Sequence, residues 1–477
     1  MKKILKDKKF YIILLVVLVF FGIFVSMNYS VDTYLLLASP KMMYVREFIT
    51  AGRIITAVFF FSLGVLHVPH YFMYLLSFIL AVFCSTMAIY ELNRILDKYV
   101  TNKLLSLILA TIIIINPFII ELWLFIETGI MMLSILSCVE AFKYFEEYVS
   151  AKEKDRKLLK KALCWMFVAL FAYQGTVALF IALCLIPIAF KAKDFKEFVK
   201  YNIFALGLYG IPTVVNYILV ILTSTKRVGS SYNLMATLKT IMDTTFHQLL
   251  NGFGLFPRGF ISGLLFISII IVLYYIYKAK ERTRLLCSLF YVLVMVYFFT
   301  IAPVLPQNSD TIVFFPRTAY AFGSIFGLLF ILINKKANNH TLIFISLILL
   351  VVEFVSFNRI EIDRYIVNYE DKQIVLQVEE KVKEYEETTG IEVKNLAIYN
   401  QQASKKFYSG LEDNINVCAK NEQPSGTALY VYYTDRKVQL ADKDEEVEKA
   451  YFNNKHWKNF SLDQVVIKGN TIHWYLY

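Results

Sequence analysis

Long apolar stretches alternate with short connections rich in lysine and arginine along the first three quarters of the chain. A helix that crosses a bilayer needs about 20 apolar residues. Nine stretches follow this pattern, and each predicts a membrane-spanning helix: 10–28, 71–92, 104–118, 128–147, 201–222, 259–277, 285–303, 318–333 and 341–356. Two more are ambiguous, because 51–66 is short for a crossing and 162–190 is long enough for one helix or for two.

The basic residues separate these alternatives. Lys and Arg near the ends of spans favour the cytoplasmic side. If 51–66 does not cross and 162–190 crosses twice, the connections on one side hold 25 basic residues, against 8 on the other side before the tail. We therefore predict a mostly α-helical membrane protein of eleven spans, with the N-terminus inside and the C-terminus outside. The shortest of these spans is 162–174. A helix of about 13 residues rises only about 20 Å.

The first outer loop, 29–70, is long and largely apolar, yet it does not cross the membrane in this topology. Such a segment is expected to lie in the membrane interface as one or two amphipathic helices. A simple packing collar around the spans is the alternative. The first span resembles a signal peptide but lacks a small-residue cleavage site, so we expect a retained anchor.

Residues 357–477 lose the long apolar runs and predict a second domain after the membrane domain of residues 1–356. A helix is expected over about 363–388, with Gly390 as its natural end. Short alternating runs follow at 393–399, 427–434 and 464–477, which is typical of strands. The tail is therefore predicted to be a small α/β domain outside the membrane. A lid, an acceptor-binding role and a docking role are all compatible with it.

Composition supports a membrane protein. Of the 477 residues, 57% are hydrophobic and 18% are charged, whereas soluble domains are nearer 45–50% apolar and 25% charged. The net charge of +11 belongs to the apolar part, because residues 357–477 alone carry −4. This positive charge is explained by loop topology, and no basic cluster interleaved with aromatic residues indicates binding of nucleic acid.

Metal and nucleotide chemistry have weak sequence support. The six cysteines contain no CxxC pair, and His67 and His70 alone offer too few ligands for a metal. No phosphate-binding loop of the GxxxxGK[ST] type is present. No cofactor is expected, although a divalent cation is compatible with the acidic residues described next.

Ionisable residues at the edge of the membrane are costly and are therefore functional candidates. Asp32 directly follows the first span and is the candidate general base. An ordinary acid at a helix end, or an N-cap, is the alternative.

Glu121 and Glu127 lie in a strongly apolar stretch, where an unpaired carboxylate would be expensive. They are expected to pair with Arg46 or Arg53 of the first loop, or to orient a substrate or bind a cation.

A third set of candidates is basic and lies in the later outer loops. It comprises Lys226, Arg227, Arg258 and Arg317. Such residues suit a lipid-linked phosphate, because a guanidinium grips phosphate with two parallel hydrogen bonds. Contact with ordinary anionic lipid is the alternative. Tyr173 and Gln174 add neutral hydrogen-bonding groups at the same level, or mark only a kink between two helices.

The order of these residues resembles the GT-C class of membrane glycosyltransferases, and more narrowly the bacterial glucosyltransferase II family. The matching residues are Asp32, Gly52-Arg53, Asn116-Pro117-Phe118 with Glu121 and Glu127, and Tyr173-Gln174. The resemblance covers roughly 10–356. One departure is that family members often carry two adjacent acids where this chain has Asp32 followed by Thr33.

The resemblance implies a sugar transferase on the outer face of the bacterial cytoplasmic membrane. Its donor would be a polyprenyl-phosphate-linked sugar such as glucose, and its acceptor a surface polysaccharide or cell-wall glycopolymer. Asp32 would take the acceptor proton, a positioned base being worth typically about 10²–10⁴-fold. Arg317, with Lys226 or Arg227, would stabilise the leaving lipid phosphate. The reaction would invert the anomeric carbon, and a donor synthase and a flippase would be partners.

Two other functions stay open on the sequence. A transporter or flippase of lipid-linked saccharides would also use outer cations and buried carboxylates, but it is expected to show internal repeats, and none is clear. A polysaccharide polymerase or ligase would share the donor but usually has a large late outer loop, whereas the longest one here is 223–258.

Overall fold

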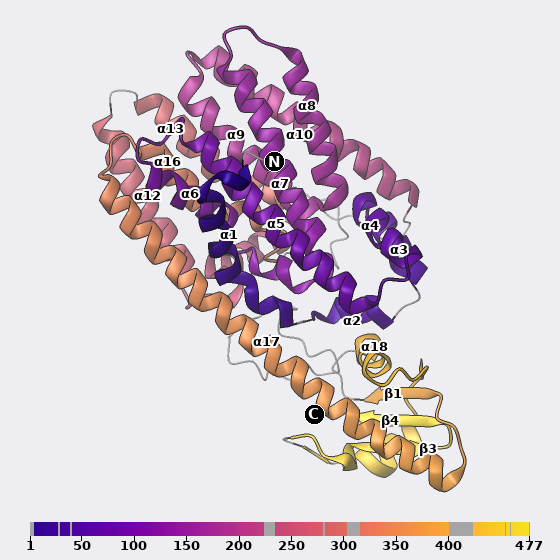
Figure 1. The fold of residues 1–477 in the computed structure, drawn as a ribbon. Coiled ribbons are helices and arrows are strands. Elements are labelled where there is room, and N and C mark those ends of the chain that lie inside the picture. Colours follow the sequence, from indigo (N-terminus) through magenta and orange to yellow (C-terminus); the bar gives the residue numbers. More distant parts are fainter. Residues whose placement is uncertain are drawn as a thin grey trace. The chain divides into compact units, whose positions relative to one another are not determined.

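The computed structural model describes residues 4–26, 29–38, 41–223, 234–279, 282–302, 315–399, 423–453, 455–457 and 459–476. The described part of the chain is mostly helical and carries one small sheet (Figure 1). It divides into two compact units. The first consists of Met1–Val25 and Val45–Asn358, and the second of Ser26–Tyr44 and Arg359–Tyr477. The second unit thus takes in part of the predicted first outer loop together with the tail.

The first unit is a bundle of helices. Its described helices are α1 Lys8–Phe21, the end of α3 Lys41–Thr50, α4 Ile54–Val65, α5 His70–Leu96, α6 Lys103–Ile114, α7 Thr128–Ser150, α8 Arg156–Ala172, α9 Ala178–Lys191, α10 Phe195–Thr223, α11 Leu234–His247, α12 Phe260–Lys278, α13 Arg282–Phe290, α14 Val296–Ile301, α15 Tyr320–Gly323, α16 Ile325–Ile333 and the first part of α17 Asn339–Thr389. Short 3-10 turns lie at Ile120–Leu124, Gln174–Thr176 and Leu249–Gly254, and a π-helical turn at Tyr291–Met295 joins α13 to α14.

Polar side chains fix where several of these helices begin. The carboxylate or amide oxygens of Asp7, Asn102 and Asp155 accept backbone N–H groups in the first turns of α1, α6 and α8. The helices α5 and α7 then approach closely at Gly129, where a Cβ atom would come within 2.4 Å of the Ser77 carbonyl oxygen. Small residues allow this kind of close packing inside a membrane.

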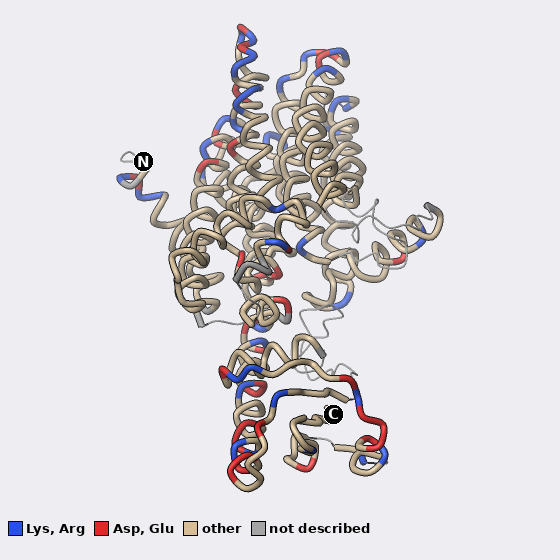
Figure 2. Tube along the Cα trace, turned by 90° about the vertical axis from the view of Figure 1, so that its right-hand side faces the viewer, with Lys and Arg blue, Asp and Glu red and all other residues tan. Residues whose placement is uncertain are grey.

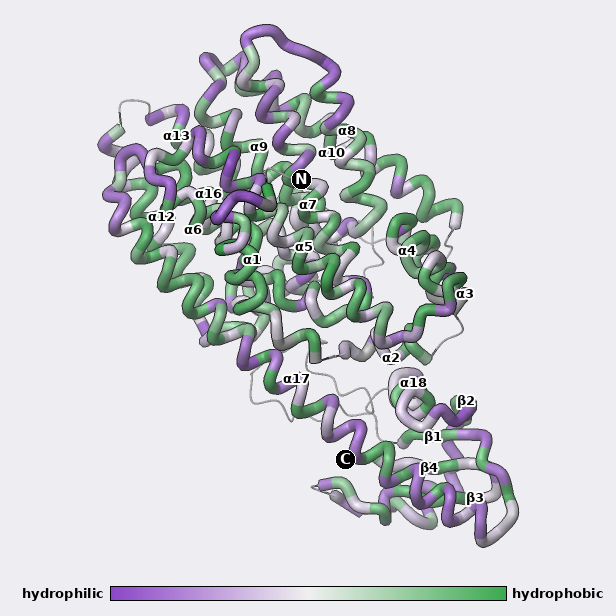
Figure 3. Tube along the Cα trace, viewed as in Figure 1, coloured by the Kyte–Doolittle hydropathy of each residue, from purple (hydrophilic) through white to green (hydrophobic). Residues whose placement is uncertain are grey.

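Seven described helices are long and apolar enough to cross a membrane by length and composition: His70–Leu96, Thr128–Ser150, Gln174–Lys191, Phe195–Thr223, Phe260–Lys278, Arg282–Ile301 and Asn339–Thr389. Many of their apolar side chains are exposed, among them Phe266 and Val351, and the bundle is apolar along the helices and polar at the helix connections (Figure 3). These features indicate a membrane protein. Many Lys and Arg residues of this unit gather at one end of its helices (Figure 2).

Each of the eleven predicted spans contains a helix in the structure. The four that fall outside the group of seven are shorter: α1, α6, α8 and the α15–α16 pair. Helix α8 begins at Arg156 rather than near residue 162, so it has 17 residues and rises about 25 Å. The full count of eleven crossings and the orientation stay predictions.

The second unit combines helices with a four-stranded sheet. Its elements are α2 Val31–Ala38, the second part of α17, α18 Gln423–Thr434, α19 Glu445–Val447 and the strands β1 Asn395–Tyr399, β2 Gln439–Leu440, β3 Val465–Lys468 and β4 Thr471–Tyr475. The strand order is β2-β1-β4-β3, with β1 parallel to β2 and β4, and β3 antiparallel to β4. Ala397, Tyr399, Val447 and Phe452 form its small core.

The tail prediction is correct for some elements and wrong for one. Strand β1 and the β3–β4 hairpin lie in predicted strand segments, and α17 ends at Thr389, before Gly390 with φ +71°. The segment 427–434, predicted as a strand, is instead part of α18. Residues from Ser425 to Tyr430 are all buried there, and the Tyr430 hydroxyl donates to Glu379 of α17 at 2.5 Å. Packing against neighbouring helices therefore outweighs the strand preference of valine and tyrosine.

Candidate functional site

Arg53 and Glu127 form an ion pair in the first unit. The Arg53 Nη1 atom lies 3.4 Å from Glu127 Oε1, and the Glu127 side chain is 5% exposed. The guanidinium of Arg53 also stacks over the Tyr173 ring, 4.7 Å from its centroid. Of the two arginines that the sequence suggested as partners for the carboxylates, Arg53 is the one that pairs with Glu127. The Arg53 guanidinium thus contacts both a carboxylate and an aromatic ring face.

The backbone just before Arg53 is fixed by two amides. The Gln174 Nε2 atom donates to the Ala51 carbonyl at 2.7 Å, and the Asn216 Nδ2 atom donates to the Gly52 carbonyl at 2.7 Å. Gly52 has φ +72°, and a Cβ atom there would lie 2.6 Å from Asn216 Nδ2. A glycine is required by this conformation and by the close approach. Gln174 and Gly52 therefore fix the backbone that carries Arg53. Neither contacts the charged atoms of the ion pair in these bonds.

A second ion pair joins Glu121 and Arg317. The guanidinium of Arg317 binds Glu121 Oε1, and the Arg317 backbone N–H donates to Glu121 Oε2 at 2.8 Å. The Glu121 side chain is 1% exposed, and the Arg317 guanidinium stacks over the rings of Phe125 and Phe315, at 4.8 and 4.3 Å. Both oxygens of a buried carboxylate are thus satisfied by one basic residue.

Asn116 holds the chain segments that carry this pair. Its side-chain oxygen accepts the Phe118 N–H at 3.0 Å, and its amide donates to the Tyr320 carbonyl at 3.1 Å. A Cβ atom at Gly323 would collide with the Asn116 side chain. The Asn116-Pro117-Phe118 stretch therefore ties the end of α6 to α15, and Arg317 lies three residues before that helix.

The two ion pairs surround Tyr173. Arg53 stacks over the Tyr173 ring, and the charges of Arg317, Glu121 and Glu127 lie near enough to act on the Tyr173 hydroxyl. We call these five residues the Tyr173 cluster. It balances two guanidinium charges against two carboxylates, so it costs far less to bury than an isolated charge.

The other predicted residues lie elsewhere. Arg46 is exposed on α3, and Arg258 is exposed before α12; among the described residues neither forms an ion pair. Asp32 is exposed in the first turn of α2 and belongs to the second unit. Lys226 and Arg227 lie outside the described residues. The structure thus brings together six candidates in the first unit: Arg53, Glu121, Glu127, Tyr173, Gln174 and Arg317.

The second unit contains a group of tyrosines that the sequence did not single out. Tyr34 follows Asp32 on α2, and its hydroxyl bonds Asn368 and lies 3.0 Å from the Tyr433 hydroxyl. Tyr29 and Tyr432 pack edge-on at 5.8 Å between ring centroids. We call Tyr29, Tyr34, Tyr432 and Tyr433 the tyrosine cluster. The only sequence signal was the run of three tyrosines within residues 430–433, in a segment predicted as a strand.

Among the described residues, no group of three or more His, Cys, Asp or Glu side chains could hold a metal ion. The search of protein families, of curated proteins and of solved structures found no match to this chain.

Proposed function

We propose that this chain is an integral membrane glycosyltransferase that moves a hexose, such as glucose, from a polyprenyl-phosphate donor to a surface polysaccharide or cell-wall glycopolymer. The observation that supports this most is the Tyr173 cluster. Two arginines are held in fixed orientations near helix ends in a bundle that is mostly apolar. A donor with an apolar tail and an anionic phosphate matches both properties.

Arg317 is assigned to the leaving phosphate. Glu121 and two aromatic rings fix the plane of its guanidinium, and a preorganised cation stabilises charge that develops as the sugar–phosphate bond breaks. Arg53, fixed by Glu127 and Tyr173, is assigned to the donor sugar or phosphate. Glu121 and Glu127 then act by positioning the arginines, rather than by binding a cation.

Asp32 is assigned the role of general base. Its side chain is exposed, so an incoming acceptor can reach it. The proton passes from the acceptor hydroxyl to Asp32, the acceptor oxygen bonds the anomeric carbon, and that carbon loses the phosphate oxygen. One displacement inverts the anomeric centre, and the lipid phosphate leaves as the anion. Tyr432 and Tyr433 are partly exposed next to Tyr34 on α2, and such amphipathic rings suit binding of an acceptor glycan.

Gene deletion with complementation tests this proposal. The deletion strain is expected to lose one side-chain sugar from a surface glycan, and the wild-type gene to restore it. Asp32→Asn is expected to restore none of it at normal membrane levels, whereas Asp442→Asn, an exposed acid of the second unit, restores it fully. Full restoration by Asp32→Asn would remove the base assignment, and unchanged glycans in the deletion strain would remove the proposed function.

A further inference from the structure

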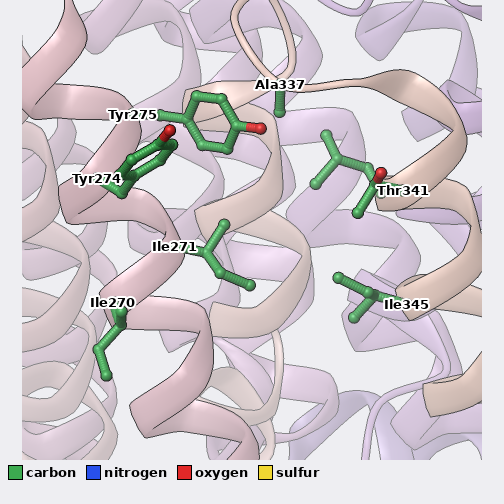
Figure 4. A pocket seen from close by; sticks show the side chains of 8 residues that line it. Ile270, Ile271, Tyr274, Tyr275, Ala337, Thr341 and Ile345 are labelled. Carbon is green, nitrogen blue, oxygen red and sulfur yellow. The ribbon is translucent and has the colours of Figure 1, made fainter.

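A groove of about 330 Å³ lies between α12 and the start of α17 in the first unit (Figure 4). Its walls come from Ile270, Ile271, Tyr274 and Tyr275 of α12, from Thr341, Leu342 and Ile345 of α17, and from Ala337 in the turn before α17. None of these residues belongs to the Tyr173 cluster. The groove therefore needs an explanation separate from the proposed transfer reaction.

The groove changes character along its length. Figure 4 shows the two tyrosine hydroxyls and the Thr341 hydroxyl towards the end at Ala337, and only isoleucine side chains at the other end. Ile270 and Tyr274 are about half exposed, so the groove is open along its side. An apolar slot with hydroxyl groups at one end fits an amphipathic molecule whose chain lies along the isoleucines.

Positive charge surrounds the hydroxyl end. The Lys278 ammonium donates to the Tyr274 hydroxyl and lies 4.2 Å from the centre of its ring, and the exposed Lys336 directly precedes Ala337. In sequence, the segments 278–284 and 335–340 carry six Lys and Arg residues and one acid, Glu281. This charge favours a ligand whose polar group is anionic.

We propose that this groove binds an anionic phospholipid of the inner leaflet, with one acyl chain between α12 and α17 and the phosphate beside Lys278 and Lys336. The distribution of basic residues predicts that this end of the bundle faces the cytoplasm. Basic pockets between spanning helices on that side bind anionic headgroups. The groove thus holds a lipid as a bound partner, independently of any sugar donor.

Native mass spectrometry of the full-length protein in detergent tests this inference with two lipids of identical chains, phosphatidylglycerol and phosphatidylcholine. Wild type is expected to retain one phosphatidylglycerol at least about 10-fold more strongly than phosphatidylcholine, given two nearby lysines. The Lys278→Gln, Lys336→Gln double variant is expected to lose this preference. Ala337→Trp, which fills the groove, is expected to lose both lipids.

The matched control removes two lysines from α8 instead, as Lys157→Gln with Lys160→Gln, and is expected to bind as wild type. Unfolding midpoints of all variants show whether each is folded. Soluble glycerol phosphate is expected not to displace the lipid. Equal retention of the two lipids by wild type, binding that survives both groove variants, or displacement by glycerol phosphate would each overturn the inference.

Discussion

Each ion pair of the Tyr173 cluster joins residues that are far apart in sequence. The Glu121–Arg317 pair is more buried than the Arg53–Glu127 pair. Removing one member of a buried ion pair leaves the other charge uncompensated, which costs about 3–5 kcal/mol. Because Arg317 remains 14% exposed, the lower end of that range applies.

We therefore predict that Arg317→Gln lowers the free energy of unfolding by about 3 kcal/mol. The Glu121→Gln, Arg317→Gln double variant should lose less than the sum of the two single losses, because both charges are gone. Equilibrium unfolding in mixed micelles measures both. Lys449→Gln, which breaks an exposed pair with Glu445, serves as the control and should change stability by less than about 0.5 kcal/mol. Strictly additive losses at positions 121 and 317 would contradict the pairing.

Gly52 and Gly259 form a natural comparison. Both have positive φ, +72° and +77°, but a Cβ atom at Gly52 meets Asn216 whereas one at Gly259 meets nothing within 4 Å. Gly259→Ala should cost only the backbone term, about 1–2 kcal/mol. Gly52→Ala should cost about 1 kcal/mol more, since Asn216 must give up its hydrogen bond to the Gly52 carbonyl.

Melting temperatures of the two alanine variants in detergent measure this difference. The Gly52 variant should also transfer less sugar than the Gly259 variant, because Gly52 sets the position of Arg53. Equal losses of stability at the two positions would show that the Asn216 side chain adds no steric cost to a Cβ atom at position 52.

Among the elements, strand β4 carries a buried histidine. His473 Nδ1 lies 2.7 Å from the Tyr399 hydroxyl, and burial lowers the pKa of the His473 ring below its usual value of 6.5, with a partial opposing effect of Asp444. At a pH between the lowered pKa of the folded state and about 6.5, the His473 ring is neutral in the folded chain but protonated in the unfolded chain. The stability that this provides is complete above about pH 6.5 and is lost as the pH falls from there towards the folded pKa.

We predict that hydrogen exchange of the β1 and β4 amides in the full-length protein, corrected for intrinsic rates, accelerates as the pH falls below about 6.5. The His473→Gln variant should lose this pH dependence, and the exposed His340→Gln variant should keep it. Acceleration that is equally steep in both variants would rule out His473 as the titrating group.

Elements set by local pattern could be predicted from the sequence. A helix lies in each long apolar stretch, the 162–190 stretch breaks at 173–176, and α17 ends before Gly390. The segment 427–434 could not be predicted, because its helix is selected by contacts with α17 and α2 rather than by its own residues. The continuity of α17 over 51 residues was also missed, since its apolar and polar parts look like separate helices.

The candidate site could be predicted only as a set of residue types. The sequence showed which charged residues were out of place in apolar surroundings, and it offered Arg53 as a partner for the carboxylates. It could not show that Arg317 satisfies Glu121, because the two are 196 residues apart and no local pattern links them. The tyrosine cluster was missed for the same reason, since Tyr34 and Tyr433 come from distant segments.

For the whole molecule, the positive-inside pattern predicts that the tail lies outside the membrane. Cysteine labelling in intact cells measures this with a variant that keeps only Cys418 of the six cysteines. An impermeant thiol reagent should label Cys418 in intact cells. Lys152→Cys in the same background, within a predicted cytoplasmic connection, should be labelled only after lysis. The reverse labelling pattern would place the tail in the cytoplasm and would contradict the proposed topology.

Reconstituted transfer tests the proposed activity most directly. The purified protein in proteoliposomes receives polyprenyl-phosphate glucose together with the glycan isolated from the deletion strain, and the released polyprenyl phosphate and the glucosylated glycan are both measured. We predict acceptor-dependent release that matches glycan labelling one for one, with the Asp32→Asn protein inactive and Asp442→Asn fully active. Labelling that requires a nucleotide sugar, or undiminished transfer by the Asp32→Asn protein, would contradict the proposed reaction.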